Sequence, residues 1–289
     1  DSFLENLENP NQWGWVLCSK SGATIEVTTL FDYCYLWMKK KHNISILENC
    51  LVVTEEKPSL LSNLAKKEKL PTLSMPKEVG GRFSVFTSIG LYPLSFLDFK
   101  LEDFLNSFES CLKKESLILE ISSQIFASVQ REDQSFYIFQ YSDSLSQWSL
   151  WLQQLLSESL AKKTTRSQGK AQNFPTLVPC RGASDQHSVL QQIMEGAQKK
   201  FCCFHRVENS ERSDLKINRS LFEESFVVGK SPGTLLGIEA EATQRAMNES
   251  QIPTMVLKTQ KLDEASIGYL MAAWMLSTGV LGELLDINA

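Results

Sequence analysis

The sequence predicts an α/β protein with mainly parallel sheets, and three observations support this fold class. Short apolar runs that fit buried strands alternate with longer segments of helical spacing, beginning with a strand at 15–18 and a helix at 24–41. A second strand at 51–53 and a polar-faced helix at 59–69 repeat this order, which is typical of βαβ units with crossover helices. The chain has 289 residues, 43% hydrophobic and 22% charged. At about 150 residues per domain, this length predicts two domains or one large α/β unit.

Composition excludes several classes of protein. A formal net charge of -5 argues against a general nucleic-acid binder, and 14 glycines and 9 prolines exclude collagen-like and low-complexity chains. Seven cysteines without CxxC spacing predict no zinc site and buried thiols in a reducing cytoplasm. The apolar stretch 267–285 contains Gly268, Gly279 and Glu283, so we expect a buried core helix and no membrane contact.

A domain boundary is predicted near residue 75. Pro71 and Pro76 interrupt a segment without helical period, which favours a linker at 70–76 and domains at 1–75 and 76–289. Beyond it, helical spacing or apolar runs predict further helices and strands. The helices are 101–114, 145–159, 186–194, 235–249 and 263–285, and the strands are 136–139, 199–207 and 254–257.

A candidate anion-binding loop follows the first predicted strand. It contains Ser19, Lys20, Ser21, Gly22 and Thr24 and leads directly into a helix. The start of a helix presents unpaired backbone N–H groups, and three hydroxyls with an ammonium group complete a cradle for phosphate. A plain Ser/Thr helix cap is the alternative, and it stays open.

Three more side chains are candidates for chemistry. Arg82 follows the glycine pair Gly80–Gly81 and offers a fixed positive charge for a developing oxyanion, or it lies on a surface turn. His187 stands at a predicted helix start, which favours a neutral imidazole able to exchange a proton. Glu158 closes a helix, where its charge opposes the helix dipole, a cost often accepted at functional sites.

Taken together, these motifs resemble the glucose-6-phosphate isomerase (phosphoglucose isomerase) family, in its bacterial type. Residues 79–85 resemble its Gly-Gly-Arg-(Phe/Tyr)-Ser signature, and residues 19–26 its Ser-Lys-(Ser/Thr)-Gly-x-Thr-x-Glu phosphate loop. Residues 153–160 are similar to the Gln-Leu-x-x-Glu-Ser-Leu segment, and residues 184–188 to the Asp-x-His-Ser helix. Segments 252–270 and 281–288 resemble the closing strand and helix, so the likeness spans essentially the whole chain.

The resemblance implies two sugar-isomerase-type domains, each with three α/β/α layers. The first domain would contain the phosphate loop 19–24 and would be incomplete. It also implies interconversion of glucose 6-phosphate and fructose 6-phosphate through a cis-enediol, without metal or organic cofactor. Glu158 would be the base, Arg82 would stabilise the intermediate, and His187, contributed across a homodimer interface, would assist ring opening. The implied substrate-binding residues are Ser19, Lys20, Ser21, Thr24, Glu26, Gly81 and Gln154.

Two family segments are expected outside these 289 residues. A Gly-Gly-Ser loop should precede residue 1, and a Phe-Asp-Gln motif with a ring-opening lysine should follow residue 289, so a longer protein is expected. Two alternative functions remain. One is a bifunctional phosphoglucose/phosphomannose isomerase, and the other is a non-catalytic sugar-phosphate-binding protein on the same fold.

Overall fold

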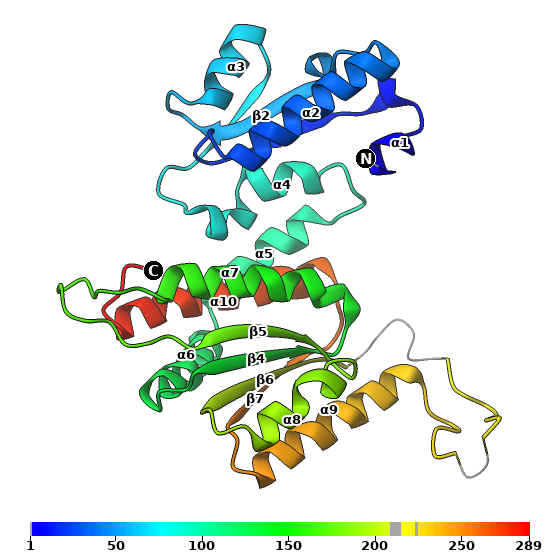
Figure 1. Ribbon diagram of the computed structural model, residues 1–289, viewed down its shortest axis with the longest axis vertical. Helices are drawn as coiled ribbons and strands as arrows, with labels where there is room; N and C mark the ends of the chain where they lie inside the picture. Colours follow the sequence, from blue (N-terminus) through cyan, green and yellow to red (C-terminus); the bar gives the residue numbers. More distant parts are fainter. Residues whose placement is uncertain (1, 209–214, 223–224) are drawn as a thin grey trace. The chain divides into compact units, whose positions relative to one another are not determined.

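The computed structural model describes residues 2–208, 215–222 and 225–289, and the chain divides into two compact units (Figure 1). The first unit ends at Leu101 and the second begins at Glu102. The boundary predicted at residue 75 lies earlier in the chain than this division. Residues 76–101 stay with the first unit because α4 packs on its sheet, where the Ser88 hydroxyl donates a 2.8 Å hydrogen bond to the Ser74 carbonyl.

The first unit is built on a parallel three-stranded sheet of order β1-β2-β3. Its core brings Met38 of α2, Val52 of β2 and Leu61 of α3 together on one face of the sheet. On α2 the buried residues Phe31, Cys34 and Met38 recur at helical spacing, which places them on one side of the helix. The elements are α1 (Ser2–Glu5), η1 (Pro10–Gln12), β1 (Trp15–Cys18), α2 (Ile25–His42), η2 (Ile46–Asn49), β2 (Cys50–Glu55), α3 (Leu60–Glu68), β3 (Thr72–Met75), η3 (Gly81–Phe86) and α4 (Ser88–Leu94).

The linker predicted at 70–76 is wrong, because this segment contains the strand β3. β3 pairs in parallel with β2, and the carbonyl of Pro71 accepts a 3.0 Å hydrogen bond from the amide of Val52. An edge strand tolerates a flanking proline because its ladder needs only one row of backbone groups. Pro71 therefore marks the entry to a strand.

The second unit contains a parallel four-stranded sheet of order β5-β4-β6-β7. Each predicted strand and helix after residue 101 is present, with boundaries shifted by a few residues. The sequence did not identify α6 or assign β5, which contains Pro179. The elements are α5 (Leu101–Leu112), α6 (Glu115–Gln130), β4 (Ser135–Gln140), η4 (Asp143–Leu145), α7 (Ser146–Leu160), β5 (Thr176–Arg181), α8 (Gln186–Glu195), β6 (Lys200–Val207), α9 (Pro232–Glu249), β7 (Thr254–Thr259) and α10 (Glu264–Leu284).

Helices cover both faces of this second sheet, with α7 and α10 on one side and α8 and α9 on the other (Figure 1). Phe139 of β4 stacks on Phe204 of β6 in the core shared with α8 and α9. Phe136 of β4 stacks on Phe201 of β6 in the same way. This pair lies three positions earlier on each strand, so it faces the other side of the sheet. Burial on both faces explains why these strands are apolar throughout, and it gives the three-layer α/β/α arrangement expected.

The long apolar helix is α10. By length and hydropathy it could cross a membrane, and half of its most apolar window is buried within the protein. Trp274 is fully buried against α7, and Ser277 at its centre donates a 3.3 Å hydrogen bond to the Ile118 carbonyl of α6. In this structure α10 is therefore a packed helix of the second unit.

Candidate active site

The loop between β1 and α2 gathers three hydroxyl groups at the carboxyl edge of the first sheet. The Ser19 hydroxyl lies 2.8 Å from that of Thr24 and 3.4 Å from that of Ser21, and Ser21 and Thr24 are 3.3 Å apart. Thr24 is the N-cap residue of α2, yet its side chain makes no capping hydrogen bond to the helix. The plain cap considered from sequence is therefore not formed by Thr24, and its hydroxyl joins the cluster instead. Ser21 and Thr24 are exposed.

Gly22 fixes the shape of this loop. Its φ of +65° lies in the left-handed region, and a Cβ added there would stand 2.1 Å from Oγ of Ser59. The Gly22 amide donates to the Ser19 hydroxyl at 3.2 Å, and its carbonyl accepts from the Leu61 amide at 2.9 Å. Only glycine adopts this conformation readily and also fits the space beside Ser59. The hydrogen bond from Leu61 holds the loop against the start of α3.

Lys20 connects this loop to the segment that leads into Arg82. Its ammonium group donates a 2.8 Å hydrogen bond to the carbonyl of Lys77, while its own carbonyl accepts from the Glu55 amide at 3.3 Å. Sequence reasoning assigned the ammonium of Lys20 to the cradle and missed Lys77. No sequence signal identifies Lys77, because the contact joins residues 57 positions apart through the order of the strands.

Arg82 lies in the first turn of η3, directly after Gly80 and Gly81. Its guanidinium carbon is 5.3 Å from the centroid of the Phe83 ring, a cation–π distance. Neither glycine has a positive φ, so the backbone conformation of this turn does not require glycine at either position. A Cβ added at Gly81 would meet no atom within 4 Å, so the protein's own packing does not require glycine there.

Glu158 and Gln154 face outward, one turn apart near the end of α7. Nε2 of Gln154 donates a 2.9 Å hydrogen bond to Oε1 of Glu158, and the ammonium of Lys162 donates to the Glu158 carbonyl. The leucines Leu152, Leu155 and Leu156 point the other way and are fully buried. Their helical spacing therefore presents the carboxylate and its amide partner on the exposed side of the helix.

His187 lies in the first turn of α8, as predicted, and it is exposed. The preceding turn is fixed in two ways. The Gln186 amide donates a 2.7 Å hydrogen bond to the Tyr141 hydroxyl, and a Cβ on Gly182 would stand 2.4 Å from the Tyr141 ring. The Asp185 carboxylate accepts the Arg181 amide at 2.6 Å and does not cap the helix.

Within the second unit, Glu158 and His187 lie at opposite ends of the sheet and on opposite faces. α7 follows the carboxyl end of β4 and runs back along the sheet, so Glu158 lies toward the amino ends of the strands (Figure 1). Gln153 confirms this placement, since its amide donates to the Leu177 carbonyl near the start of β5 at 2.8 Å. α8 begins beyond the carboxyl end of β5, on the other face. One copy of this unit therefore does not bring the two side chains together.

Comparison with known proteins identifies the family. The model of the family described as phosphoglucose isomerase matches residues 9–289. The chain belongs to the phosphoglucose isomerase family. It is 31% identical over 277 residues to the glucose-6-phosphate isomerase of Thermus thermophilus, covering 94% of this chain and 66% of that protein. It is 32% identical over 294 residues to the probable glucose-6-phosphate isomerase of Methanococcus maripaludis, covering 99% of this chain and 64% of that protein.

Solved structures agree with this phosphoglucose isomerase membership at the level of fold. A hypothetical protein of Thermus thermophilus superposes with a TM-score of 0.89 at 30% identity, over 100% of this chain and 70% of that one. The glucose-6-phosphate isomerase of Chlamydia trachomatis superposes with a TM-score of 0.84 at 22% identity, over 99% of this chain and 57% of that one. The chain thus spans about two thirds of the length of its phosphoglucose isomerase relatives, or less.

The described side chains show no arrangement that would hold a metal ion. Within residues 2–208, 215–222 and 225–289, no group of three or more His, Cys, Asp or Glu side chains is arranged to hold a metal ion. The candidate residues supply hydroxyls, a guanidinium, a carboxylate and an imidazole. This set is suited to binding an anion and moving protons.

Proposed function

We propose that this chain carries the phosphate-binding and proton-transferring parts of an aldose–ketose isomerase acting on glucose 6-phosphate and fructose 6-phosphate. The observation that carries the proposal is the hydroxyl cluster of Ser19, Ser21 and Thr24 at the start of α2, in a chain of the phosphoglucose isomerase family. These hydroxyls and the first amides of an 18-residue helix are donors that suit a phosphate group.

The remote phosphate supplies binding energy and fixes the reacting carbons. Ser19, Ser21 and Thr24 would hold the phosphate oxygens, with Lys20 beside them, and Glu26 would line the site from the first turn of α2. Gly81, with open space where a Cβ would lie, lets a bound sugar approach the backbone next to Arg82. Binding of the remote phosphate holds the reacting carbons in position and so lowers the barrier to proton transfer.

Glu158 is the proposed base, with Gln154 orienting its carboxylate. Glu158 takes the proton from C2 of the open-chain aldose, the C2–H electron pair becomes the C1–C2 double bond, and the C1=O π pair moves to O1, which takes a proton from solvent. The cis-enediol then releases the O2 proton to solvent, the O2 electron pair forms the C2 carbonyl, and the C1–C2 π pair takes the proton back from Glu158 at C1. Arg82 stabilises the negative charge that develops on the enediol oxygens.

His187 is proposed to act in a second copy of the chain, in a homodimer. The support is its position at the sheet end and face opposite to Glu158 within one unit. An imidazole can both donate and accept a proton, which suits proton exchange at the ring oxygen during ring opening. The free thiols of all seven cysteines suit a reducing cytoplasm, which we propose as the location.

The proposal is tested by a coupled assay that follows glucose 6-phosphate formed from fructose 6-phosphate. The assay is run on this chain and on a version extended at both ends to the length of its relatives. We expect turnover in the extended version, and its absence there would refute the isomerase. Calorimetric binding of glucose 6-phosphate without turnover would indicate the non-catalytic alternative. Turnover of mannose 6-phosphate as well would indicate the bifunctional one.

A further inference from the structure

Two polar side chains lie side by side in the interior of the second unit. Gln140 ends β4 and His205 lies on β6, and they are direct partners in the parallel register of these strands. Gln140 is 3% exposed and His205 is fully buried. Their neighbours on the same strand faces, at Ile138 and Cys203, are apolar and fully buried. An amide and an imidazole in such surroundings require hydrogen-bond partners.

Most polar atoms of this cluster have no partner among the described residues. Both amide atoms of Gln140, Nδ1 of His205 and the indole nitrogens of Trp148 and Trp274 make no hydrogen bond to any of them. His205 satisfies only its other nitrogen, Nε2, which lies 2.7 Å from the Thr259 hydroxyl. Leaving buried polar groups unsatisfied is costly, and native interiors rarely tolerate several of them together.

The four side chains form one contiguous group. The Trp148 ring of α7 meets the His205 imidazole edge to face, with centroids 5.2 Å apart. The Trp274 ring of α10 meets Trp148 in the same manner at 6.2 Å. The rings of His205, Trp148 and Trp274 therefore form a continuous chain of contacts from β6 to the helices α7 and α10, and Gln140 lies beside His205 at one end of it.

The chemistry of the group selects water as its occupant. The Gln140 amide offers two N–H donors and one acceptor oxygen, the indoles offer donors, and Nδ1 of His205 donates or accepts according to its tautomer. Burial lowers the pKa of His205 to about 4, so its ring is neutral near pH 7. Neutral groups of both kinds suit a molecule that donates and accepts, whereas an anion or a metal ion needs compensating charge.

We propose that Gln140, His205, Trp148 and Trp274 form a buried hydration site that holds one or two ordered water molecules inside the second unit. A buried water typically makes about three hydrogen bonds, and these side chains have five unsatisfied polar atoms. The water joins the carboxyl ends of β4 and β6 to the helices that cover this face.

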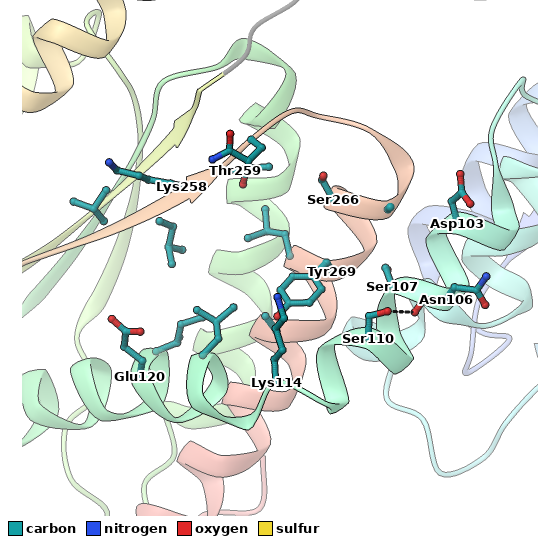
Figure 2. A pocket seen from close by; sticks show the side chains of 18 of the residues that line it. Asp103, Asn106, Ser107, Ser110, Lys114, Glu120, Lys258, Thr259, Ser266 and Tyr269 are labelled. Atoms are coloured by element: carbon teal, nitrogen blue, oxygen red, sulfur yellow. Dashed lines mark hydrogen bonds between the residues drawn. The ribbon is translucent and has the colours of Figure 1, made fainter.

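Thr259 lies between this site and solvent. Its hydroxyl contacts His205 on one side, and the residue also lines a groove of about 640 Å³ between β7, α10, α5 and α6. Figure 2 shows Thr259 and Lys258 on β7 across the groove from Lys114 and Glu120 of α6. Solvent in the groove therefore reaches Thr259, whose hydroxyl contacts His205 of the proposed site.

A high-resolution crystal structure of the chain tests the proposal directly. We expect water density within hydrogen-bonding distance of the Gln140 amide and of Nδ1 of His205. Gln140→Leu, which keeps a similar volume without polar atoms, should lose that density, whereas the exposed control Gln192→Leu should retain it. A direct hydrogen bond between Gln140 and His205, or an interior without water, would overturn the proposal.

A solution measurement keeps the test independent of crystals and of the stability of Gln140→Leu. The indole N–H signals of Trp148 and Trp274, assigned with Trp148→Phe and Trp274→Phe, should show magnetisation transfer to a long-lived bound water. Loss of this transfer in Gln140→Leu with retention in Gln192→Leu would support the site. Absence of transfer in the unchanged protein would contradict it.

Discussion

Nε2 of Gln154 donates a 2.9 Å hydrogen bond to Oε1 of Glu158, one turn further along the exposed side of α7. This bond fixes one carboxylate oxygen of the proposed base without burying it. The pair is local, since both residues belong to one helix and are spaced by four positions. The geometry of the helix therefore brings these two side chains together.

Glu158→Gln is expected to reduce kcat by about 10²–10⁴-fold, because a positioned general base contributes a factor of that size. Binding of glucose 6-phosphate, measured by calorimetry, should change little, since the phosphate loop lies in the other unit. Gln154→Leu should lower kcat by about tenfold, or ~1.4 kcal/mol. The exposed control Gln147→Leu on the same helix should not change kcat. Full activity in Glu158→Gln would exclude this carboxylate as the base.

Mixing two inactive variants tests whether His187 acts across a homodimer. If each site takes Glu158 from one copy and His187 from the other, then a Glu158→Gln copy paired with a His187→Gln copy forms one intact site. Co-expression of the two variants in the extended protein should restore roughly a quarter of the unchanged activity, given random pairing of subunits. Activity no higher than that of the separate variants would mean that both groups act within one copy.

Gly22→Ala should destabilise the first unit by about 1–3 kcal/mol, through its left-handed backbone and through displacement of Ser59. Ser59 caps α3 by accepting the Ser62 amide, so the clash also loosens that helix. Gly81→Ala is the matched control, and it should leave urea unfolding unchanged because its Cβ meets open space. Because the proposed site places Gly81 beside the sugar, Gly81→Ala should weaken binding of glucose 6-phosphate without changing stability. Equal stability of the two variants would contradict the role given to Gly22.

Stability should fall as pH falls from about 6.5 to 4, because the unfolded chain binds a proton at His205 in this range and the folded chain does not. The loss amounts to about 3 kcal/mol, since the folded pKa is lowered by burial. The groups that face the imidazole, Gln140, Trp148 and Thr259, carry no charge that titrates in this range. NMR titration of the His205 ring gives the pKa directly. A midpoint near 6.5 would show that the ring is hydrated well enough to charge freely.

Thiol reagents should modify Cys18 first in the folded protein. Cys18 is partly exposed at the end of β1, whereas the other six cysteines are buried. Burial also raises the pKa of Cys180 and of Cys202 to about 12, so their thiolate fraction is small. Mass spectrometry of the folded protein should find one early adduct, and Cys18→Ser should remove it. Early modification of Cys202 would show that the second sheet opens readily.

Local pattern was sufficient for most elements and for the candidate residues. Alternating or helical spacing predicted β1, α2 and α7, and the turn before α8 predicted the place of His187 at a helix start. β3 was missed because Pro71 and Pro76 were interpreted as a linker, although an edge strand accommodates a proline beside it. β5 was missed for a related reason, since Pro179 lies inside it.

The sequence by itself determined the local motifs and their place on the elements: hydroxyls at the carboxyl end of β1, two glycines before Arg82, and a histidine at the start of α8. Each of these motifs consists of residues close together in the chain. Only the tertiary structure decided which of these meet. Strand order brings Lys20 to the Lys77 carbonyl, and the antiparallel return of α7 carries Glu158 to the sheet end opposite His187. Register alone pairs Gln140 with His205. Contacts between distant positions depend on how strands align, and no local spacing encodes that alignment.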